Sequence, residues 1–229
     1  MIPESVGESS VRDIFQDRGY DSPLQNPLEI CYSDESLLLV IKPAGLLAVP
    51  GRGADKQDCL SSRLQKEFPD TLVVHRLDMS TSGLMVFARG AEMQRKLSEL
   101  FRERAVEKCY VAVVAGQLET TGEINLPIAA DWPNRPLRKI DHDSGKPSLT
   151  RYRLLSYDSA TDTSRIELEP ITGRTHQLRL HLAAIGHPIL GDALYGGRTA
   201  LRLMLHASNL IFVHPLTGAV LNFTNAPPF

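Results

Sequence analysis

The chain has 229 residues, of which 42% are hydrophobic, and a formal net charge of −2. It is long enough to bury a substantial core, and without an apolar run of about 18 residues or a signal-peptide pattern we expect a cytoplasmic protein. Its average charge disfavours a nucleic-acid partner, and its three scattered cysteines form no C-x-x-C pair that would indicate a zinc or redox motif.

The first 27 residues are polar and show no sustained periodicity. We expect them to form a loosely ordered lead-in before a single domain that spans residues 28–229. That domain opens with two strand-like runs, LEICYS at 28–33 and LLLVIKP at 37–43, which flank a short polar turn. The pattern predicts an antiparallel hairpin.

Three segments have helical spacing. Residues 58–67 and 91–104 place apolar side chains on one face. In the third segment, residues 175–186, Thr175 is a candidate N-cap and Gly186 a candidate terminator.

The remaining apolar runs predict strands, and many of their connections are too short for helical crossovers. We therefore expect an α+β fold with a mixed, mainly antiparallel central sheet and flanking helices. The predicted strands are residues 83–89, 109–116, 148–157, 165–171, 208–215 and 219–224.

Charge is unevenly distributed along the chain. Residues 1–38 contain eight acidic and two basic residues, which leaves a net charge of +4 for the rest. Residues 131–153 carry six basic residues against three aspartates. This concentration permits RNA binding, although a solvated basic loop explains it equally well.

The most informative segment is HRLDMSTSG at residues 75–83, a polar cluster directly before an apolar strand. Loops at strand ends often carry catalytic groups. Taken alone, the Asp78 carboxylate could instead cap a turn or pair with Arg76.

This segment resembles the HRLD-x-x-T-S-G signature of the RluA-type pseudouridine synthases, and the resemblance extends in family order from about residue 29 to 228. A further resemblance, to an insertion in the member after which the family is named, lies in DWPNRP and SGKP at 131–136 and 144–147. Many relatives begin with an S4 RNA-binding domain, for which too few residues precede the hairpin here. The other matching segments are KCY at 108–110, GRTHQLR at 173–179, GHPILGD at 186–192 and LMLHA at 203–207.

The resemblance implies a pseudouridine synthase fold with a central catalytic cleft. It also implies an enzyme that isomerises uridine to pseudouridine in structured RNA, either a large-subunit ribosomal RNA loop, a tRNA anticodon stem-loop, or both. No cofactor and no metal are expected, because the reaction changes no oxidation state. RNA would be the obligatory partner of a monomeric enzyme, and binding should weaken as salt rises.

The same resemblance assigns catalytic roles to three residues. Asp78 would be the nucleophile, although a carboxylate could attack the ribose anomeric carbon, attack the uracil ring or remove a ribose proton. Arg179 would keep Asp78 ionised, and Tyr110 would stack on the uracil after it has flipped out of the RNA. Without the resemblance, Tyr110 would be interpreted as a half-buried core aromatic and Arg179 as a surface helix residue.

Five further residues are expected to bind substrate. Arg76 would fill the vacated place in the RNA stack, and Leu205, which could also be simple core, would form an apolar wall of the uracil pocket. His75, Arg174 and His206 lie in the same matching segments.

Other functions fit the sequence less well. A metal hydrolase using His176, His181 and His187 lacks the usual ligand spacing, and GRGADKQ at 51–57 lacks the phosphate-binding loop pattern. A non-catalytic RNA-binding or chaperone module on the same fold is the stronger alternative, which the joint presence of Asp78, Tyr110 and Arg179 disfavours.

Overall fold

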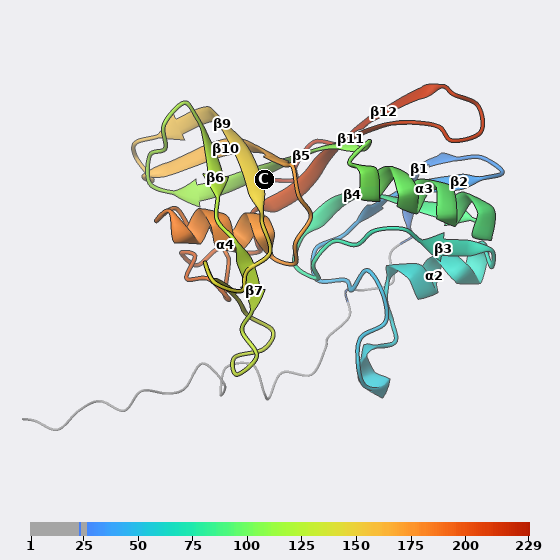
Figure 1. Cartoon of the computed structure of the whole chain (residues 1–229), viewed down its shortest axis with the longest axis horizontal. Coiled ribbons are helices and arrows are strands. Elements are labelled where there is room, and N and C mark those ends of the chain that lie inside the picture. The colour runs from blue at the N-terminus through green and yellow to red at the C-terminus, as the bar shows by residue number, and fades with distance from the viewer. Residues whose placement is uncertain (1–22, 24–26) are drawn as a thin grey trace, which may run out of the picture.

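The computed structural model describes residue 23 and residues 27–229, so the lead-in expected at 1–27 lies almost entirely outside the described residues. A ten-stranded sheet forms the frame, in the order β1-β2-β4-β11-β5-β10-β9-β6, with β3 beside β4 and β12 beside β11 (Figure 1). Its strands are β1 (Glu29–Ser33), β2 (Leu37–Lys42), β3 (Thr71–Val73), β4 (Ser82–Arg89), β5 (Glu107–Ala115), β6 (Thr121–Asn125), β9 (Leu149–Asp158), β10 (Thr163–Pro170), β11 (Leu205–Val213) and β12 (Val220–Thr224).

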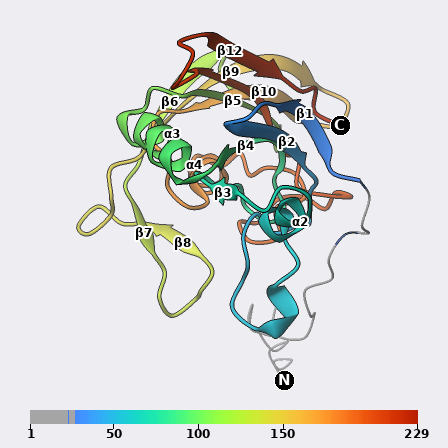
Figure 2. The ribbon, with the colours of Figure 1, turned by 90° about the vertical axis from the view of Figure 1, so that its right-hand side faces the viewer.

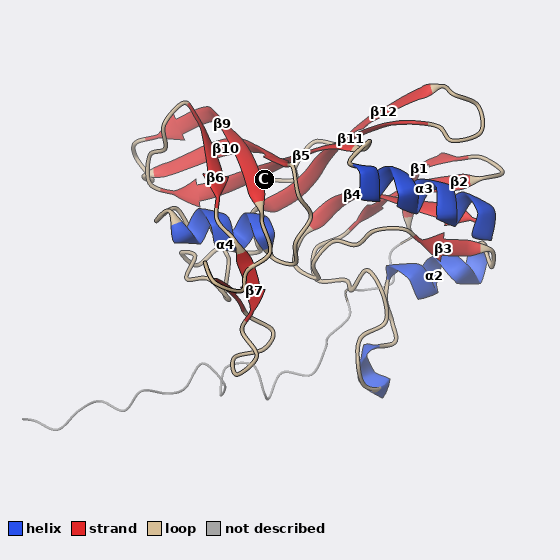
Figure 3. Ribbon diagram, viewed as in Figure 1, coloured by secondary structure: helices blue, strands red, loops and turns tan. Residues whose placement is uncertain are grey.

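Helices flank this sheet, as Figure 3 shows by secondary structure. They are α2 (Leu60–Glu67), α3 (Ala91–Glu103) and α4 (Gln177–Ala184), and a short 3-10 helix η1 (Ala54–Lys56) lies in a loop. A separate ribbon of β7 (Ile128–Ala130) and β8 (Arg138–Ile140) projects from the same side of the molecule as the η1 loop (Figure 2). No helix in the described part of the chain is long and apolar enough to cross a membrane.

All strand pairs of the main sheet are antiparallel except one. β4 and β11 run parallel, with His206 opposite Ser82 and Ala207 opposite Gly83. The prediction of an α+β fold with a mixed, mainly antiparallel sheet is confirmed, as is the β1–β2 hairpin.

The β1–β4 half of the sheet is covered on both faces. Alternate residues of β2 enter two different cores: Leu37 packs in the core that contains α3 residues, and Leu38 packs in the core that contains α2 residues. Leu84 and Met85 divide in the same way on β4. Burial on both faces explains why these strands are apolar at nearly every position.

The other half of the sheet is covered on one face only. Ile166 and Leu168 of β10 pack with Leu178 and Leu182 of α4. The charged residues that alternate with them, Arg165, Glu167 and Glu169, face the opposite side and are more exposed. The HRLD segment and the strand that carries Tyr110 lie where the two halves meet.

The structure corrects some local expectations. The sequence did not indicate β3, β6, β7 or β8, which have three to five residues and too little alternation to be recognised. The third helix begins at Gln177, and its N-cap is His176 in the left-handed conformation (φ 58°) rather than Thr175. No side chain forms a capping hydrogen bond at the start of this helix. The Gln177 side chain accepts instead from the backbone N of Arg174, in the loop before the helix.

Candidate active site

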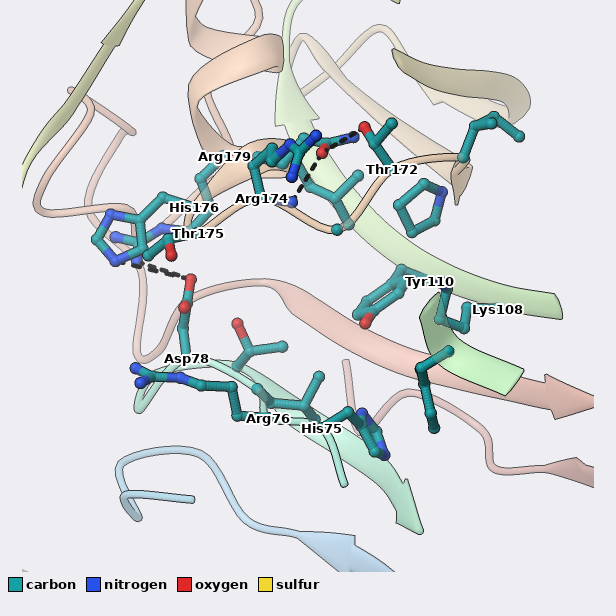
Figure 4. Close-up of a pocket in the computed structure, with 18 of the residues that line it drawn as sticks. His75, Arg76, Asp78, Lys108, Tyr110, Thr172, Arg174, Thr175, His176 and Arg179 are labelled. Carbon is teal, nitrogen blue, oxygen red and sulfur yellow. Dashed lines mark hydrogen bonds and ion pairs between the residues drawn. The ribbon is translucent and has the colours of Figure 1, made fainter. Parts of the chain in front are cut away.

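A cavity of about 610 Å³ opens between the HRLD loop, the 170–179 segment, the end of α3 and the start of β5 (Figure 4). Asp78 is the only acidic residue among the described residues that line it. Six cationic residues share the lining: Arg76, Arg102, Arg104, Lys108, Arg174 and Arg179. The cavity therefore combines one carboxylate with a surface suited to a polyanion.

Backbone contacts hold the loop that presents Asp78. Thr81 N donates to Asp78 O at 3.1 Å, and Gly45 N donates to Met79 O at 2.8 Å. The loop then enters β4 at Gly83, where a Cβ would overlap the backbone of Ala207 on β11. With φ at 117°, this position requires glycine for both conformation and space.

Lys42 lies fully buried beneath the same loop. Its ammonium donates to the carbonyl oxygens of Pro43 at 2.8 Å, Leu46 at 2.7 Å and Met79 at 2.9 Å. Burial lowers the pKa of Lys42 to about 7, while the negative charge of Asp78 opposes that change. The side chain thus fastens the loop that presents Asp78 to the turn that follows β2.

Arg179 connects two carboxylates. Its Nε and Nη2 donate to the two oxygens of buried Asp192 at 2.8 and 2.7 Å, and its Nη1 contacts Asp78 Oδ2 at 3.4 Å. Although burial opposes the guanidinium charge, the hydrogen bonds and charge of Asp192, together with the charge of Asp78, raise the pKa of Arg179. The planar fork therefore holds a fixed positive charge beside Asp78.

His176 approaches Asp78 from the other side. Its Nε2 lies 3.9 Å from Asp78 Oδ2, and its Nδ1 lies 2.8 Å from the Tyr195 hydroxyl. In Figure 4, the Asp78 carboxylate points toward both His176 and Arg179. The sequence indicated His176 only as an unfavourable metal ligand.

Tyr110 and Leu205 both line the cavity. The Tyr110 ring is half-buried and packs against both adjoining cores. Burial, with a smaller effect of the Asp78 charge, raises the pKa of Tyr110, so its hydroxyl is neutral at ordinary pH. Leu205 is 3% exposed and is both a core residue and part of the wall.

Arg76, Arg174 and His75 also reach the cavity. Arg76 and Arg174 are exposed. His75 stacks on Phe101 with 4.5 Å between ring centres, and its Nε2 accepts from Val86 N at 3.0 Å. Burial lowers the pKa of His75 to about 3, so it contributes a neutral wall.

The structure does not bring His206 to the cavity. Its buried ring lies between Ser82 Oγ, 2.7 Å from Nδ1, and Asn225 Oδ1, 2.9 Å from Nε2. His206 thus ties β11 to the start of β4 and is not among the residues that line the cavity.

The three histidines considered as metal ligands form hydrogen bonds with different partners. His181 bonds to Thr150 Oγ1 and Leu126 O, and His187 bonds to Ala115 O, whereas His176 bonds to Tyr195. In the described residues, no group of three His, Cys, Asp or Glu side chains could hold a metal ion.

The basic stretch at 131–153 is partly neutralised by ion pairs. Arg151 pairs with Glu123, Arg153 with Glu167, and Lys139 with Asp141. The less paired cationic surface is the cavity lining, whose members come from distant parts of the sequence. Linear charge patterning could not reveal it.

Sequence reasoning also missed the roles of Lys42, Gln177, Asp192 and Tyr195. Gln177 accepts from the Arg174 backbone and from the Thr172 hydroxyl, which shapes the loop before α4. Gln177 and Asp192 lie in two of the segments that resemble the family, and this resemblance was the sequence signal that could have indicated their roles. For Lys42, the available signal was a single charged residue at the end of an otherwise apolar strand.

Comparisons with known proteins agree with this geometry. The sequence profile of the RNA pseudouridylate synthase family matches residues 36–184. The chain is 48% identical over 204 residues to the dual-specificity RNA pseudouridine synthase RluA of Vibrio parahaemolyticus, with 86% of this chain and 82% of the relative covered. It is 44% identical over 209 residues to the RluA protein of Escherichia coli K12, with coverages of 89% and 95%.

The fold is similar to a solved structure as well. Human RNA pseudouridylate synthase domain containing 1 superposes with a TM-score of 0.73 at 32% identity, covering 88% of this chain and 84% of that one.

Proposed function

The chain belongs to the RNA pseudouridylate synthase family and isomerises uridine in RNA to pseudouridine, and we propose that it does so in the cavity around Asp78. The observation that carries this assignment is the lone carboxylate of that cavity, contacted by Arg179 Nη1 at 3.4 Å and surrounded by cationic side chains. A fixed positive charge favours the ionised carboxylate that the reaction requires.

The reaction exchanges one bond of the ribose anomeric carbon for another. Its bond to uracil N1 breaks, a bond to C5 forms, N1 gains a proton, and the hydrogen on C5 leaves to solvent. Asp78 supplies the nucleophile or base, by attack on the anomeric carbon or the uracil ring, or by removal of a ribose proton. No oxidation or reduction occurs in any of these routes.

The target base must first leave its stack, at a cost of a few kcal/mol. Tyr110 lies where it can stack on the flipped uracil, which contributes roughly 1–3 kcal/mol, and Leu205 forms an apolar wall. Arg76, exposed at the cavity, fills the vacated place in the RNA. Arg174 and His75 complete the proposed substrate-binding surface.

The substrate is proposed to be a large-subunit ribosomal RNA loop, a tRNA anticodon stem-loop, or both. The similar RluA proteins are named as dual-specificity enzymes, which supports both classes. We further infer that residues 28–229 act as one catalytic domain, a monomer in the cytoplasm. The continuous sheet from β1 to β6 supports the single domain.

Tritium release tests the proposal. Transcripts of ribosomal RNA and tRNA carry uridine labelled at carbon 5, and wild type is compared with Asp78→Asn. Catalytic release by wild type from both RNAs, and none by the variant, is expected. Release by Asp78→Asn at the wild-type rate would remove Asp78 from the mechanism, and release from one RNA only would exclude dual specificity.

A further inference from the structure

The contacts behind Asp78 form a chain of hydrogen bonds with a defined direction. The Arg138 backbone N–H donates to the Tyr195 hydroxyl oxygen at 3.0 Å. The phenolic proton is then free to donate to His176 Nδ1, 2.8 Å away. Among the described residues, His176 Nδ1 is the acceptor within hydrogen-bond distance of that proton, so we assign Tyr195 as the donor of the second bond.

This direction fixes the tautomer of His176. A neutral imidazole that accepts at Nδ1 carries its proton on Nε2. Nε2 is the atom that faces Asp78 Oδ2, at 3.9 Å. His176 therefore presents an N–H group to the reactive carboxylate, at a distance that can shorten when substrate closes the site.

The surroundings keep His176 neutral. Burial lowers the pKa of His176, and the charges of Arg179 and Arg138 act in the same direction, whereas Asp78 and Asp192 oppose them. Tyr195 packs edge-on against the imidazole and also lies 5.3 Å from the Arg179 guanidinium. One phenol ring thus contacts both groups that flank Asp78.

The backbone of His176 is left-handed, with a φ of 58°. Among residues other than glycine, asparagine, aspartate and histidine adopt this region most readily, and glutamine does so less often. Histidine and asparagine therefore both suit the backbone at position 176, and they differ in how far their side chains reach.

We propose that His176 is a positioning residue for Asp78, oriented through Tyr195 by the backbone of β8. The inference rests on the proposed role of the cavity and adds a neutral donor to the cation that Arg179 supplies. It also connects the β7–β8 ribbon to His176 through two hydrogen bonds, and His176 faces the Asp78 carboxylate across 3.9 Å. Arg138, on that ribbon, has a buried Nε without a hydrogen-bond partner in the described structure.

Two substitutions separate positioning from a structural role. His176→Gln keeps a neutral N–H at about the reach of Nε2, and His176→Asn suits the left-handed backbone but is too short. With tritium release from labelled tRNA, we expect kcat to fall about tenfold or more in His176→Asn and about threefold or less in His176→Gln, with KM unchanged in both. The melting temperature should follow the opposite order, with His176→Asn more stable than His176→Gln.

Tyr195→Phe tests the tautomer, because it keeps the ring contacts and removes the hydroxyl. Without its donor, Nδ1 can take a proton, and a His176 cation would pair with Asp78 and reduce its reactivity. We expect kcat to fall about fivefold from pH 8 to pH 6 relative to wild type. Tyr157→Phe, whose hydroxyl bonds to Asp162 far from the cavity, should show no such change.

The double variant His176→Gln, Tyr195→Phe should lose the acid-side decline, since glutamine does not titrate. Equal kcat for His176→Asn and wild type, with Asp78→Asn inactive, would overturn the positioning role alone. Full activity of Asp78→Asn would overturn both this inference and the proposed site. An unchanged pH profile in Tyr195→Phe would overturn the role of Tyr195.

Discussion

Two clusters in this molecule contain an aspartate, a histidine and a tyrosine, and they differ in how fully the aspartate is bonded. Asp34 accepts from the Tyr32 hydroxyl at 2.8 Å, the Ser36 hydroxyl at 2.7 Å, Leu37 N at 2.8 Å and His214 Nε2 at 3.2 Å. Asp78 has its described side-chain contacts at 3.4 and 3.9 Å, to Arg179 and His176.

The first cluster is structural. His214 Nδ1 accepts from the backbone of Leu216 and Thr217, so its proton lies on Nε2 and it cannot act as a base toward Ser36. Although burial alone would raise it, hydrogen bonds from Ser36, Tyr32 and Leu37 hold the pKa of Asp34 well below its usual range. A carboxylate with its acceptor sites filled stabilises the fold, whereas one with long contacts keeps lone pairs available for a substrate.

Exchanging the two aspartates for asparagine should separate activity from stability most clearly. Asp78→Asn should lower turnover by at least about a thousandfold with little change in stability, because the proposed nucleophile or base is lost. Asp34→Asn should keep kcat and lower stability by about 2 kcal/mol, since charged hydrogen bonds weaken. Tritium release and urea unfolding measure the two effects, and a reversed pattern would contradict the comparison.

Arginine at position 179 should be needed for its shape as well as its charge. Arg179→Lys cannot hold Asp192 with two bonds and also reach Asp78, so we expect kcat to fall about a hundredfold. Arg63→Lys is the matched control, because Arg63 makes a similar two-bond pair with Asp58 away from the cavity. Full turnover by Arg179→Lys would show that the planar fork is unnecessary.

Removal of the Tyr110 hydroxyl should lower kcat by a smaller factor than Arg179→Lys does, and removal of the Tyr32 hydroxyl should not lower it. Tyr110→Phe keeps the ring proposed to stack on uracil but removes a neutral hydroxyl, so RNA binding should persist while kcat falls about tenfold or more. Tyr32→Phe removes a bond to Asp34 and should leave kcat unchanged. Single-turnover kinetics with a filter-binding assay separate the two steps, and a fully active Tyr110→Phe would exclude its hydroxyl from the reaction.

The smallest expected effect is the acid dependence of stability. Because the pKa of Asp34 is depressed in the folded state, its contribution is complete above its unfolded pKa, near 4, and declines as pH falls below that value. The stability difference between wild type and Asp34→Asn should therefore be largest at pH 7 and shrink toward pH 3. A difference that stays constant over this range would contradict the assigned hydrogen bonds.

The sequence predicted the fold class and most long strands because burial on one or two faces leaves a clear pattern in β2, β4 and β10. Short strands such as β7 and β8 leave none. The matching segments identified Asp78 and Tyr110, and the structure places both at the cavity. The matching segments could not show that Asp192 holds Arg179 or that His206 does not line the cavity, because both depend on tertiary contacts between distant segments.

The cavity is complete only after β4 and β11 have paired in parallel. Ser82 and His206 are 124 residues apart in the chain, and the cavity also needs Tyr110 from β5 and Arg179 from α4. Such long-range pairing is slow to form, because the connecting chain must be ordered first. We therefore expect a chain emerging from the ribosome to be inactive until β11 has been synthesised and has paired with β4.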